Sequence, residues 1–410
     1  MSRYAETLDW LFAQLPVFQR TGGQNYKIDL SKTWAFMEVL GHPEKDFPSI
    51  HIGGTNGKGS TSHMVASCLQ EAGYRVGLYT SPHLVDYRER IRLNGLPCSE
   101  EFVVDFVETW RTHLQRLELS FFEMSVGMAF VYFRDMHVDV AVVEVGMGGR
   151  LDSTNVLHPL VAAVTNIDLD HQAFLGNTRA AIAGEKAGIF KPGVPAIVGE
   201  RHPETDAVFR SHAAQVGASL QFAEDLAVTL TPTDLLGSYQ AKNQRLARAI
   251  LAAQQVFPVS EDELARGLLH VAEQTGLQGR WQVVSQEPFT VLDTAHNVHG
   301  LRETMAQFTS MGKGPMHIVF GMVGDKDASA ALELLPKDAK YYFCAPAIPR
   351  ALPVEALTIL GEALGLTSCA YPNVHAAWDA AQSAATSADR IYIGGSTFVV
   401  ADALKPKSAS

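Results

Sequence analysis

A lysine set among glycines is the first feature of this sequence that could do chemistry. The run SIHIGG (49–54) is typical of a buried strand, GTNGKGS overlaps its end, and TSHMVASCLQEAG (61–73) is typical of a helix. Backbone N–H groups at a strand-to-helix turn form a nest for anions, and glycines let the backbone approach a phosphate. We expect the nucleotide to be bound by Thr55, Asn56, Gly57, Lys58, Gly59 and Ser60, with Lys58 reaching the outer phosphates.

The spacing of this loop departs from the common pattern of glycine, four residues and Gly-Lys-Ser/Thr. Gly57 stands four residues after Gly53, and a glycine separates Lys58 from Ser60. A plain glycine turn is therefore the alternative. The strand before the loop and the helix after it, which starts near the hydroxyls of Ser60 and Thr61, favour a phosphate site.

Further residues with metal-binding or catalytic potential stand at expected strand ends. Glu144 closes DVAVVEV (139–145), and a carboxylate at the carboxyl end of a parallel strand beside a phosphate loop suits magnesium. His171 follows NIDLD, next to Asp168 and Asp170, where a metal ligand and a structural histidine are equally open. Lys186, in GEKAGIFK, has on its own the pattern of a lysine on a helix surface.

The elements that must position these residues alternate along the chain. Expected strands at 75–80, 139–145, 160–167 and 194–199 are predominantly apolar runs, and helical patterns such as 121–135 separate them. This alternation predicts a mostly parallel sheet with helices on both faces. Two helices follow between 241 and 271, and a second alternation begins at FTVLDTAHN and continues through MHIVFGMV, AKYYFCA, TSCAYPN and DRIYIGG.

The fold class is therefore α/β with two domains, as the length of 410 residues also favours. We expect an N-terminal P-loop-type domain over 1–283, which binds ATP, and a smaller Rossmann-like α/β domain over 284–410. The hinge is expected between Gln278 and Gln286.

Composition narrows the classes of partner. A net charge of −11 argues against nucleic acid and anionic membranes as main partners. Four widely spaced cysteines without a CxxC pair indicate a reduced, cytoplasmic protein without a zinc site. No apolar run approaches the ~20 residues that span a bilayer, and residues 1–15 form an amphipathic, acidic pattern unlike a signal peptide.

Several motifs, in order along nearly the whole chain, resemble one family. They are GTNGKGS, YTSPHL (79–84), RERIRLNG (88–95), FFEMSVGMAF (121–130), VVEVGMGGRLDSTNV (142–156), NIDLDHQAFLG (166–176), EKAGIFKPG (185–193), YQAKN (239–243), GR (279–280) and LDTAHN (292–297). Together they resemble the folylpolyglutamate synthase and dihydrofolate synthase family. This family is the folate branch of the Mur ligase superfamily of ATP-dependent amide-forming ligases.

The resemblance implies roles for particular residues. Glu144 and His171 would bind magnesium with an oxygen from Ser81, and carbamylation would turn Lys186 into a carboxylate-like ligand for a second ion. Catalysis would then rest on Lys58, Lys186, His171 and Glu144. ATP would also contact Asn243, Arg280 at the hinge, and Asp293, which resembles the residue on the nucleotide ribose. For His296, a role as a helix cap and a catalytic role are equally possible. No role is expected for Tyr239, because the family usually has histidine at this position.

FFEMSV lies on the stretch that binds pterin in the family. The candidate substrate residues are Phe122, Glu123, Ser125, Arg150, Asp152 and Ser153, with a contribution from the loop between Tyr26 and Asp29. The family often has threonine where Val126 stands, so the pterin contacts can differ here.

The implied reaction uses the γ-phosphoryl group of ATP to activate a carboxylate as an acyl phosphate, which the amine of L-glutamate attacks. Dihydropteroate and reduced folates are the expected substrates, with both activities on one chain, which is expected to be a monomer. Three other kinds of protein share some of these features. A peptidoglycan Mur ligase needs a UDP-binding domain, and only about 50 residues precede the loop. A nucleotide-dependent switch does not need Lys186 or a second domain. A dinucleotide oxidoreductase would need a different spacing in GMGGRLD.

Overall fold

The computed structural model describes residues 2–14, 29–312, 314–324 and 326–406. The chain divides into two compact units, one of Met1–Asp234 with Gln240–Leu277 and one of Leu235–Tyr239 with Gln278–Ser410. The division at Gln278 falls at the start of the segment in which the sequence places the hinge. A boundary after residue 283 would cut through the strand at Gln282–Gln286, which lies wholly in the second unit.

The first unit is built on an eight-stranded sheet in the order β4-β3-β2-β5-β1-β6-β7-β8. Among the described strands of this sheet, β3 pairs antiparallel with both β2 and β4, and the other pairings are parallel. The five strands predicted from apolar runs are confirmed as β1, β2, β5, β6 and β7. The bounds are β1 Ser49–Gly53, β2 Val76–Tyr79, β3 Ile91–Leu93, β4 Leu96–Pro97, β5 Val140–Glu144, β6 Val161–Val164, β7 Ala196–Val198 and β8 Leu220–Phe222.

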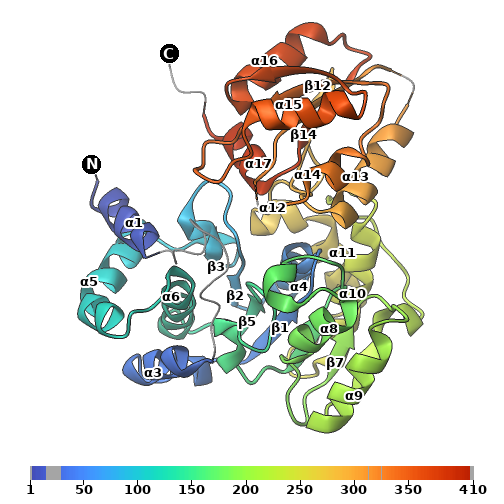
Figure 1. Cartoon of the computed structure of the whole chain (residues 1–410). Helices are drawn as coiled ribbons and strands as arrows, with labels where there is room; N and C mark the ends of the chain where they lie inside the picture. The colour runs from blue at the N-terminus through green and yellow to red at the C-terminus, as the bar shows by residue number, and fades with distance from the viewer. Residues whose placement is uncertain (1, 15–28, 313, 325, 407–410) are drawn as a thin grey trace. The chain divides into compact units, whose positions relative to one another are not determined.

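Helices accompany this sheet (Figure 1). Their bounds are α1 Arg3–Ala13, α3 Ser31–Val39, α4 Lys58–Glu71, α5 Glu100–Arg116, α6 Phe121–Asp135, α7 Gln172–Leu175, α8 Arg179–Ala187, α9 Asp206–Val216, α10 Gln240–Ala253, α11 Glu261–Leu269 and α12 Val271–Thr275. Local signals start several of them, since Ser99 caps α5 and Thr178 caps α8 with side-chain oxygens. None of the helices in the described parts of either unit has the length and apolar character needed to cross a membrane.

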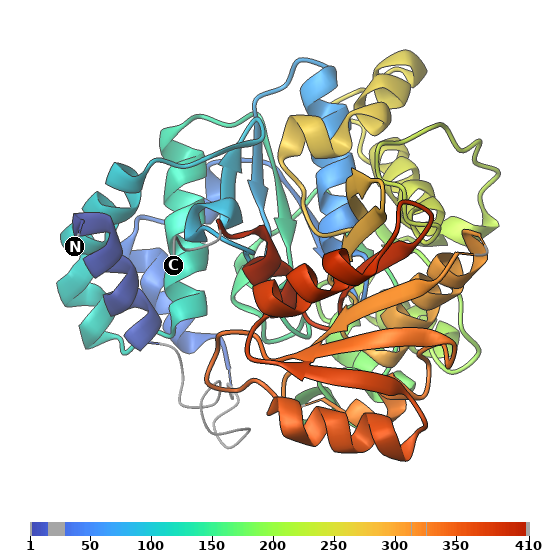
Figure 2. The same ribbon diagram turned by 90° about the horizontal axis from the view of Figure 1, so that it is seen from above.

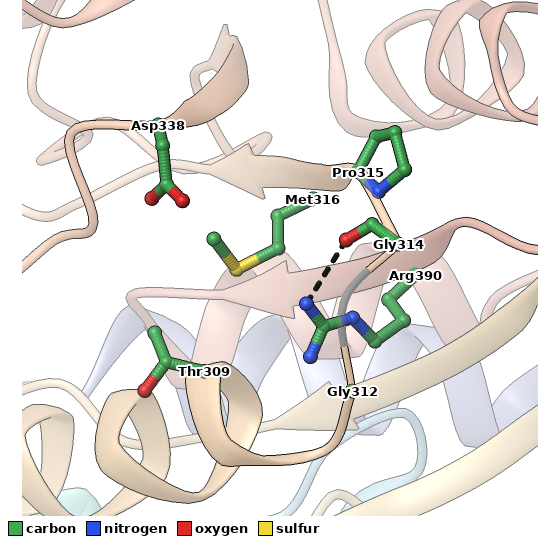
Figure 3. Close-up of a pocket in the computed structure, with 7 residues that line it drawn as sticks. All are labelled: Thr309, Gly312, Gly314, Pro315, Met316, Asp338 and Arg390. Atoms are coloured by element: carbon green, nitrogen blue, oxygen red, sulfur yellow. Dashed lines mark hydrogen bonds between the residues drawn. The ribbon is translucent and has the colours of Figure 1, made fainter.

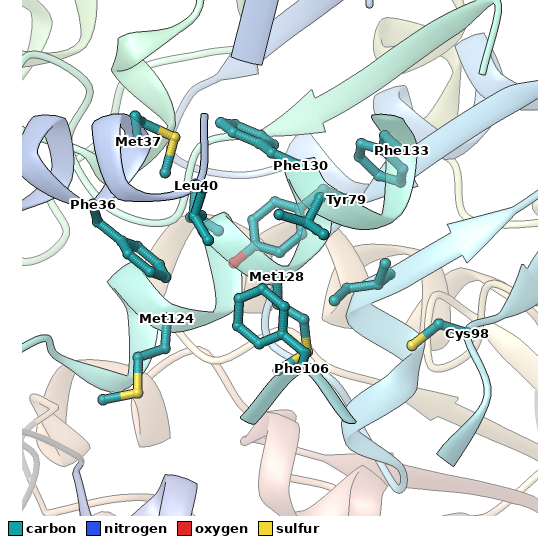
Figure 4. Packing of buried hydrophobic residues seen from close by; sticks show 14 of the residues in the cluster. Phe36, Met37, Leu40, Tyr79, Cys98, Phe106, Met124, Met128, Phe130 and Phe133 are labelled. Atoms are coloured by element: carbon teal, nitrogen blue, oxygen red, sulfur yellow. The ribbon is translucent and has the colours of Figure 1, made fainter. Parts of the chain in front are cut away.

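The core beside β2 is formed mainly by α3, α5 and α6. Figure 4 shows the interlocked side chains, contributed by Phe36, Met37, Leu40, Tyr79, Cys98, Phe106, Met124, Met128, Phe130 and Phe133. Each fully buried large apolar side chain contributes roughly 1.5–3 kcal/mol. The packing is close, because a Cβ added at Gly77 would lie 2.7 Å from the ring of Phe133. This core holds β2 and the start of α6 in place for the loops at the sheet edge.

The second unit has a six-stranded sheet in the order β13-β12-β11-β14-β10-β9, in which only β9 is antiparallel. In Figure 2 the orange and red ribbon forms this sheet, with helices along it. The five predicted strands are confirmed. The bounds are β9 Gln282–Gln286, β10 Phe289–Asp293, α13 Val298–Ser310, β11 Met316–Phe320, α14 Ala328–Leu332, β12 Ala339–Cys344, α15 Val354–Ala363, β13 Thr367–Tyr371, α16 Val374–Ala384, β14 Arg390–Gly394 and α17 Thr397–Leu404.

Candidate functional site

The loop between β1 and α4 presents open hydrogen-bond donors. Gly57 precedes the helix with φ +81° and provides no side-chain cap. The N–H groups of Lys58, Gly59 and Ser60, in the first turn, have no backbone acceptor within the part of the chain that the structure describes. Such N–H groups at a helix start attract anions. The loop therefore has the geometry that a phosphate group requires.

Residues directly after β6 hold this loop in shape. The N–H of Thr55 donates to the carbonyl of Asn166 at 2.9 Å, and the N–H of Asn56 donates to the Asn166 Oδ1 at 3.0 Å. Thr165 Oγ1 donates to the carbonyl of Asn56 at 2.6 Å. A Cβ at Gly54 would lie 1.8 Å from Thr165 Oγ1, so only glycine fits there. Neither partner is among the residues predicted from the sequence, although Asn166 stands at a strand end beside polar residues.

Helix α10 contacts the same loop. Asn243 is buried, and its Nδ2 donates to Gln240 Oε1 at 2.8 Å. Gln240 Nε2 in turn donates to Ser60 Oγ at 3.2 Å. A Cβ at Gly57 would lie 2.2 Å from Asn243 Oδ1. The structure thus brings Asn243 to the phosphate loop, together with Gln240, which the sequence analysis missed although it lies one helical turn before Asn243.

Lys186 is not the surface lysine that its local sequence suggests, because only 4% of it is exposed. Its Nζ donates to the carbonyl of Gly54 at 2.8 Å, while Lys58 Nζ donates to the carbonyl of Thr55 at 3.2 Å. Burial, followed by the charge of Lys58, lowers the pKa of Lys186 to about 7. A large share of this amine is therefore neutral and nucleophilic near pH 7.

Glu144 and Ser81 meet at the carboxyl edge of the first sheet. Glu144 is the buried last residue of β5, beside Ile52 of β1, and its Oε2 accepts the N–H of Ser81 at 3.0 Å. His171 is exposed, with φ +51°, and its N–H donates to Asp170 Oδ1 at 2.8 Å.

The donor chemistry of this edge suits a hard cation. No cluster of three or more His, Cys, Asp or Glu side chains able to hold a metal occurs among the described residues. Magnesium commonly uses one or two carboxylates and completes its shell with phosphate oxygens and water. One buried carboxylate, Glu144, beside open phosphate-binding N–H groups fits that requirement.

Two of the expected substrate residues share a buried neighbour. Glu123 accepts the N–H of Ser120 at 2.8 Å and so closes a capping box at the start of α6. Its Oε1 accepts a hydrogen bond from Thr33 Oγ1 at 3.3 Å, and Thr33 also donates to Ser153 Oγ at 3.5 Å. Glu123 therefore stabilises a helix start and shares the partner Thr33 with Ser153. Thr33 was not predicted from the sequence.

Phe122 and Ser125, on the same helix, differ in their surroundings. The ring of Phe122 lies against Gly146, where a Cβ would be 2.3 Å away. Ser125 is fully buried, donates to the carbonyl of Phe121 at 2.8 Å and accepts the Tyr87 hydroxyl at 3.0 Å. Its hydroxyl is therefore engaged inside the core.

Asp152 is buried and oriented by a relay of hydrogen bonds. Its Oδ2 accepts the N–H of Met147 at 2.9 Å, and its Oδ1 accepts the N–H of Thr154 at 3.0 Å. The Thr154 hydroxyl lies 2.8 Å from Nε2 of His51, which is in the middle of β1. Asp152 is thus held rigidly from β1, the strand that leads into the phosphate loop.

Arg150, in contrast, is exposed and pairs with Glu185 at 2.8 Å. Residues 26–28 of the remaining candidate loop lie outside the described residues. Asp29, at its end, accepts the N–H of Ser31 at 2.8 Å.

In the second unit Asp293 ends β10 and is buried. Its Oδ2 accepts the Tyr239 hydroxyl at 2.6 Å and the N–H of Trp281 at 2.8 Å, and its Oδ1 accepts the N–H of Ala295 at 2.8 Å. Burial raises the pKa of Asp293, while the bond from Tyr239 opposes that shift.

Arg280 and His296 lie near this carboxylate. Arg280 Nη1 donates to the hydroxyl of Thr294, and His296 Nδ1 lies 3.0 Å from the Thr294 carbonyl. The side chain of Asn297, not His296, caps α13 by accepting the N–H of Gly300 at 2.9 Å. The capping role considered for His296 is therefore wrong, because the next residue has the extended backbone and the oxygen that a cap requires.

A pocket of about 480 Å³ lies elsewhere in the second unit (Figure 3). Its walls include Met316 and Arg390, the first residues of β11 and β14, whereas Asp293 is the last residue of β10. Because β10 and β14 are parallel, the pocket and Asp293 occupy opposite edges of the sheet. None of the predicted site residues lines this pocket.

Comparison with known proteins gives the family. Residues 52–225 match the Mur ligase middle domain, and residues 279–397 match the Mur ligase glutamate ligase domain. Dihydrofolate synthase/folylpolyglutamate synthase of Bacillus subtilis is 34% identical over 386 residues, which cover 85% of this chain and 86% of that protein. The chain belongs to the folylpolyglutamate synthase/dihydrofolate synthase family.

Solved structures of this family share the whole fold. E. coli FolC in complex with DHPP and ADP matches with a TM-score of 0.83 and 33% identity, covering 97% of this chain and 96% of that one. A bifunctional folylpolyglutamate synthase/dihydrofolate synthase with Mn, AMPPNP and L-glutamate bound matches with a TM-score of 0.84 and 30% identity, covering 98% and 97%. The Mur ligase resemblance expected from the sequence motifs is confirmed.

Proposed function

We propose that this protein is an ATP-dependent ligase that joins L-glutamate to dihydropteroate and to reduced folates. The observation that carries the proposal is the phosphate loop, whose open N–H groups and Lys58 lie at the same sheet edge as the Glu144 carboxylate. Relatives that cover most of the chain bear both synthase names, and their structures hold ADP, or AMPPNP with Mn and L-glutamate.

The division of labour follows the two domains expected from the sequence. In the proposal the N-terminal domain, expected over 1–283, binds ATP and the pterin substrate, and the C-terminal domain, expected over 284–410, is the glutamate ligase domain; the boundary moves to Gln278 so that β9 stays whole. The match of the latter region to the Mur ligase glutamate ligase domain supports this assignment.

The nucleotide is bound mainly by backbone groups. The open N–H groups of Lys58, Gly59 and Ser60 surround the phosphates, in a loop whose shape Thr55, Asn56 and Gly57 set. Lys58 turns from the Thr55 carbonyl to the γ-phosphoryl group, and Asn243 closes the loop from α10. Arg280 and Asp293 bind the rest of the nucleotide. Phosphoryl transfer depends chiefly on positioning and on neutralising charge, and these residues supply both.

The proposed reaction has two steps. The substrate carboxylate attacks the γ-phosphorus and ADP leaves, which gives an acyl phosphate. The neutral amine of L-glutamate then attacks the acyl carbon, and inorganic phosphate leaves as the amide forms and the amine loses a proton. Water must be excluded between the steps, because it hydrolyses the acyl phosphate.

Glu144, His171 and Ser81 would hold magnesium, with carbamylated Lys186 as the ligand of a second ion. Magnesium neutralises charge on the phosphates and on the acyl phosphate. The carbamate forms when the neutral Lys186 amine attacks carbon dioxide, making a C–N bond and releasing one proton. The pKa of about 7 for Lys186 supports this modification, because an ordinary lysine is almost fully protonated at neutral pH.

The substrate site in this proposal lies along the start of α6 and the loop after β5. Phe122 offers a flat apolar face, and Glu123, Asp152 and Ser153 offer polar groups on rigid supports. Ser125 supports α6 from inside, and the exposed Arg150 suits the carboxylates of the folate tail. We further propose that the protein acts as a cytoplasmic monomer on small molecules.

The test is phosphate release from Mg-ATP and L-glutamate by the purified protein, with dihydropteroate in one tube and tetrahydrofolate in another. Release in both tubes is expected. Release in one alone would show a single activity, and release in neither, with ATP still bound, would contradict the proposal. Lys58→Met is the matched control, because it should abolish turnover without changing the core.

A further inference from the structure

Tyr239 occupies an unusual place in the chain. It is the last residue of the short segment Leu235–Tyr239 that belongs to the second unit, and it directly precedes α10. Its ring lies against the backbone of its own turn, because a Cβ at Gly237 would be 2.7 Å from the Tyr239 ring. Its hydroxyl donates to Oδ2 of Asp293 at 2.6 Å. The ring therefore shapes the turn, while the hydroxyl contacts the carboxylate.

Among the described residues, three hydrogen-bond donors contact the Asp293 carboxylate. Two are backbone N–H groups, of Trp281 and Ala295, and the Tyr239 hydroxyl is the side-chain donor. The charged and titratable groups that face it are Arg280, Tyr239 and Tyr392, the last from neighbouring β14. The backbone donors are fixed by the fold, so the tyrosine hydroxyl is the donor that a substitution can remove.

Opposing effects act on the charge of this carboxylate. Burial raises the pKa of Asp293, and the hydrogen bond from Tyr239, the charge of Arg280 and the backbone N–H groups lower it. Burial of the hydroxyl and the charge of Asp293 raise the pKa of Tyr239 well above its usual value, so it remains a donor at neutral pH. Removal of the Tyr239 hydroxyl would take away one of the effects that lower the pKa of Asp293. That pKa would rise, and Asp293 would bind a proton at a higher pH.

We propose that Tyr239 is a positioning residue for the nucleotide, and that its hydroxyl holds the Asp293 carboxylate ionised and oriented to accept a hydrogen bond from a nucleotide hydroxyl. This rests on the proposed role of Asp293 in binding ATP. A protonated Asp293 presents a donor and loses its charge, so it is a weaker acceptor for the nucleotide hydroxyl. Tyr239 thereby sets nucleotide affinity without itself touching the reacting atoms.

The decisive variant is Tyr239→Phe, which keeps the ring against Gly237 and removes only the hydroxyl. Tyr341→Phe is the matched control, because it removes a buried tyrosine hydrogen bond, to the Pro336 carbonyl, in the same unit. The dissociation constant of Mg-ATP by calorimetry, and KM and kcat, are measured from pH 6 to pH 8.5. Circular dichroism verifies that both variants fold.

For Tyr239→Phe we expect KM and the dissociation constant for Mg-ATP to rise about tenfold at pH 7, in the range of a lost hydrogen bond to a charged group, with kcat changed less than twofold. The loss should grow as pH falls, because protonation of Asp293 then competes. Tyr341→Phe should leave ATP binding and its pH profile unchanged. A uniform loss at all pH values, or one equal to that of Tyr341→Phe, would overturn the inference.

Asp293→Asn separates this inference from the proposed function. If that variant binds ATP normally, the nucleotide role of Asp293 is wrong. If it weakens ATP binding while Tyr239→Phe does not, the inference alone fails. The double variant should be no weaker than Asp293→Asn, since both substitutions act through one carboxylate. Should Tyr239→Phe not fold, the inference requires that Asp293→Asn abolish the acid dependence of ATP binding seen in the wild type.

Discussion

Substitution of Gly57 by alanine tests the contact between the phosphate loop and α10. The residue has φ +81°, a conformation that costs an L-residue roughly 1–2 kcal/mol. Its new Cβ would also lie 2.2 Å from Asn243 Oδ1 and force that side chain to move. Asn243 would then lose its bond to Gln240, which contributes about 1 kcal/mol, and the overpacking adds a similar amount.

Gly73 provides the control. It has a similar φ of +88°, and nothing lies within 4 Å of the Cβ that alanine would add. Both substitutions restrict the unfolded chain equally. We therefore expect Gly57→Ala to lower the free energy of unfolding of the first unit by about 1–3 kcal/mol more than Gly73→Ala does.

The assay is urea unfolding followed by circular dichroism without nucleotide, with the transition of the first unit fitted separately. In an Asn243→Ala background the excess cost of Gly57→Ala should shrink, because the contacting atom is gone. Equal destabilisation by Gly57→Ala and Gly73→Ala would refute the close approach of Asn243 to the loop.

Three other outcomes are expected. With ¹³C-bicarbonate, a carbamate resonance should appear in the NMR spectrum of the wild type and not in that of Lys186→Arg. The resonance should grow between about pH 6 and pH 8, because the pKa of Lys186 is about 7. A pH-independent or absent resonance would contradict carbamylation. Burial lowers the pKa of His51 to about 3, so between about pH 3 and pH 6.5 the folded state binds fewer protons than the unfolded state. The free energy of unfolding should therefore fall by about 1.4 kcal/mol for each pH unit as the pH drops through this range. In His51→Gln this part of the pH dependence of urea unfolding should vanish. Arg150→Ala removes an ion pair of an exposed arginine with Glu185, so stability should change by less than about 0.5 kcal/mol while KM for the folate substrate rises. An unchanged KM would exclude Arg150 from the substrate site.

The sequence predicts the parts of the fold that depend on local pattern. The run 140–143 (VAVV) is apolar throughout because β5 is buried along its whole length, and it is recognisable for that reason. β9 was not predicted, because its residues are partly buried or exposed and include three polar side chains. The short strands β3 and β4 were not predicted, because two or three residues are too few to show a periodic pattern.

The candidate site shows the same limit. Glu144 and the phosphate loop could be placed together because strand ends of a parallel sheet share an edge. The burial of Lys186 against the Gly54 carbonyl could not be read from its neighbours, which are those of an ordinary helix. The bond between Tyr239 and Asp293 joins residues far apart in sequence, and no local pattern encodes such a pair.

The contacts that hold the phosphate loop in shape determine when this loop can fold during synthesis of the chain. β1 and the loop leave the ribosome early, but Thr165 and Asn166, which hold Asn56, are synthesised much later, and Asn243 later still. Contacts between such distant segments form only after a long loop of chain has closed. A nascent chain that ends before β6 therefore lacks a finished cradle, and ATP cannot assist its folding. Nucleotide can stabilise this protein only after the first unit has been synthesised through α10.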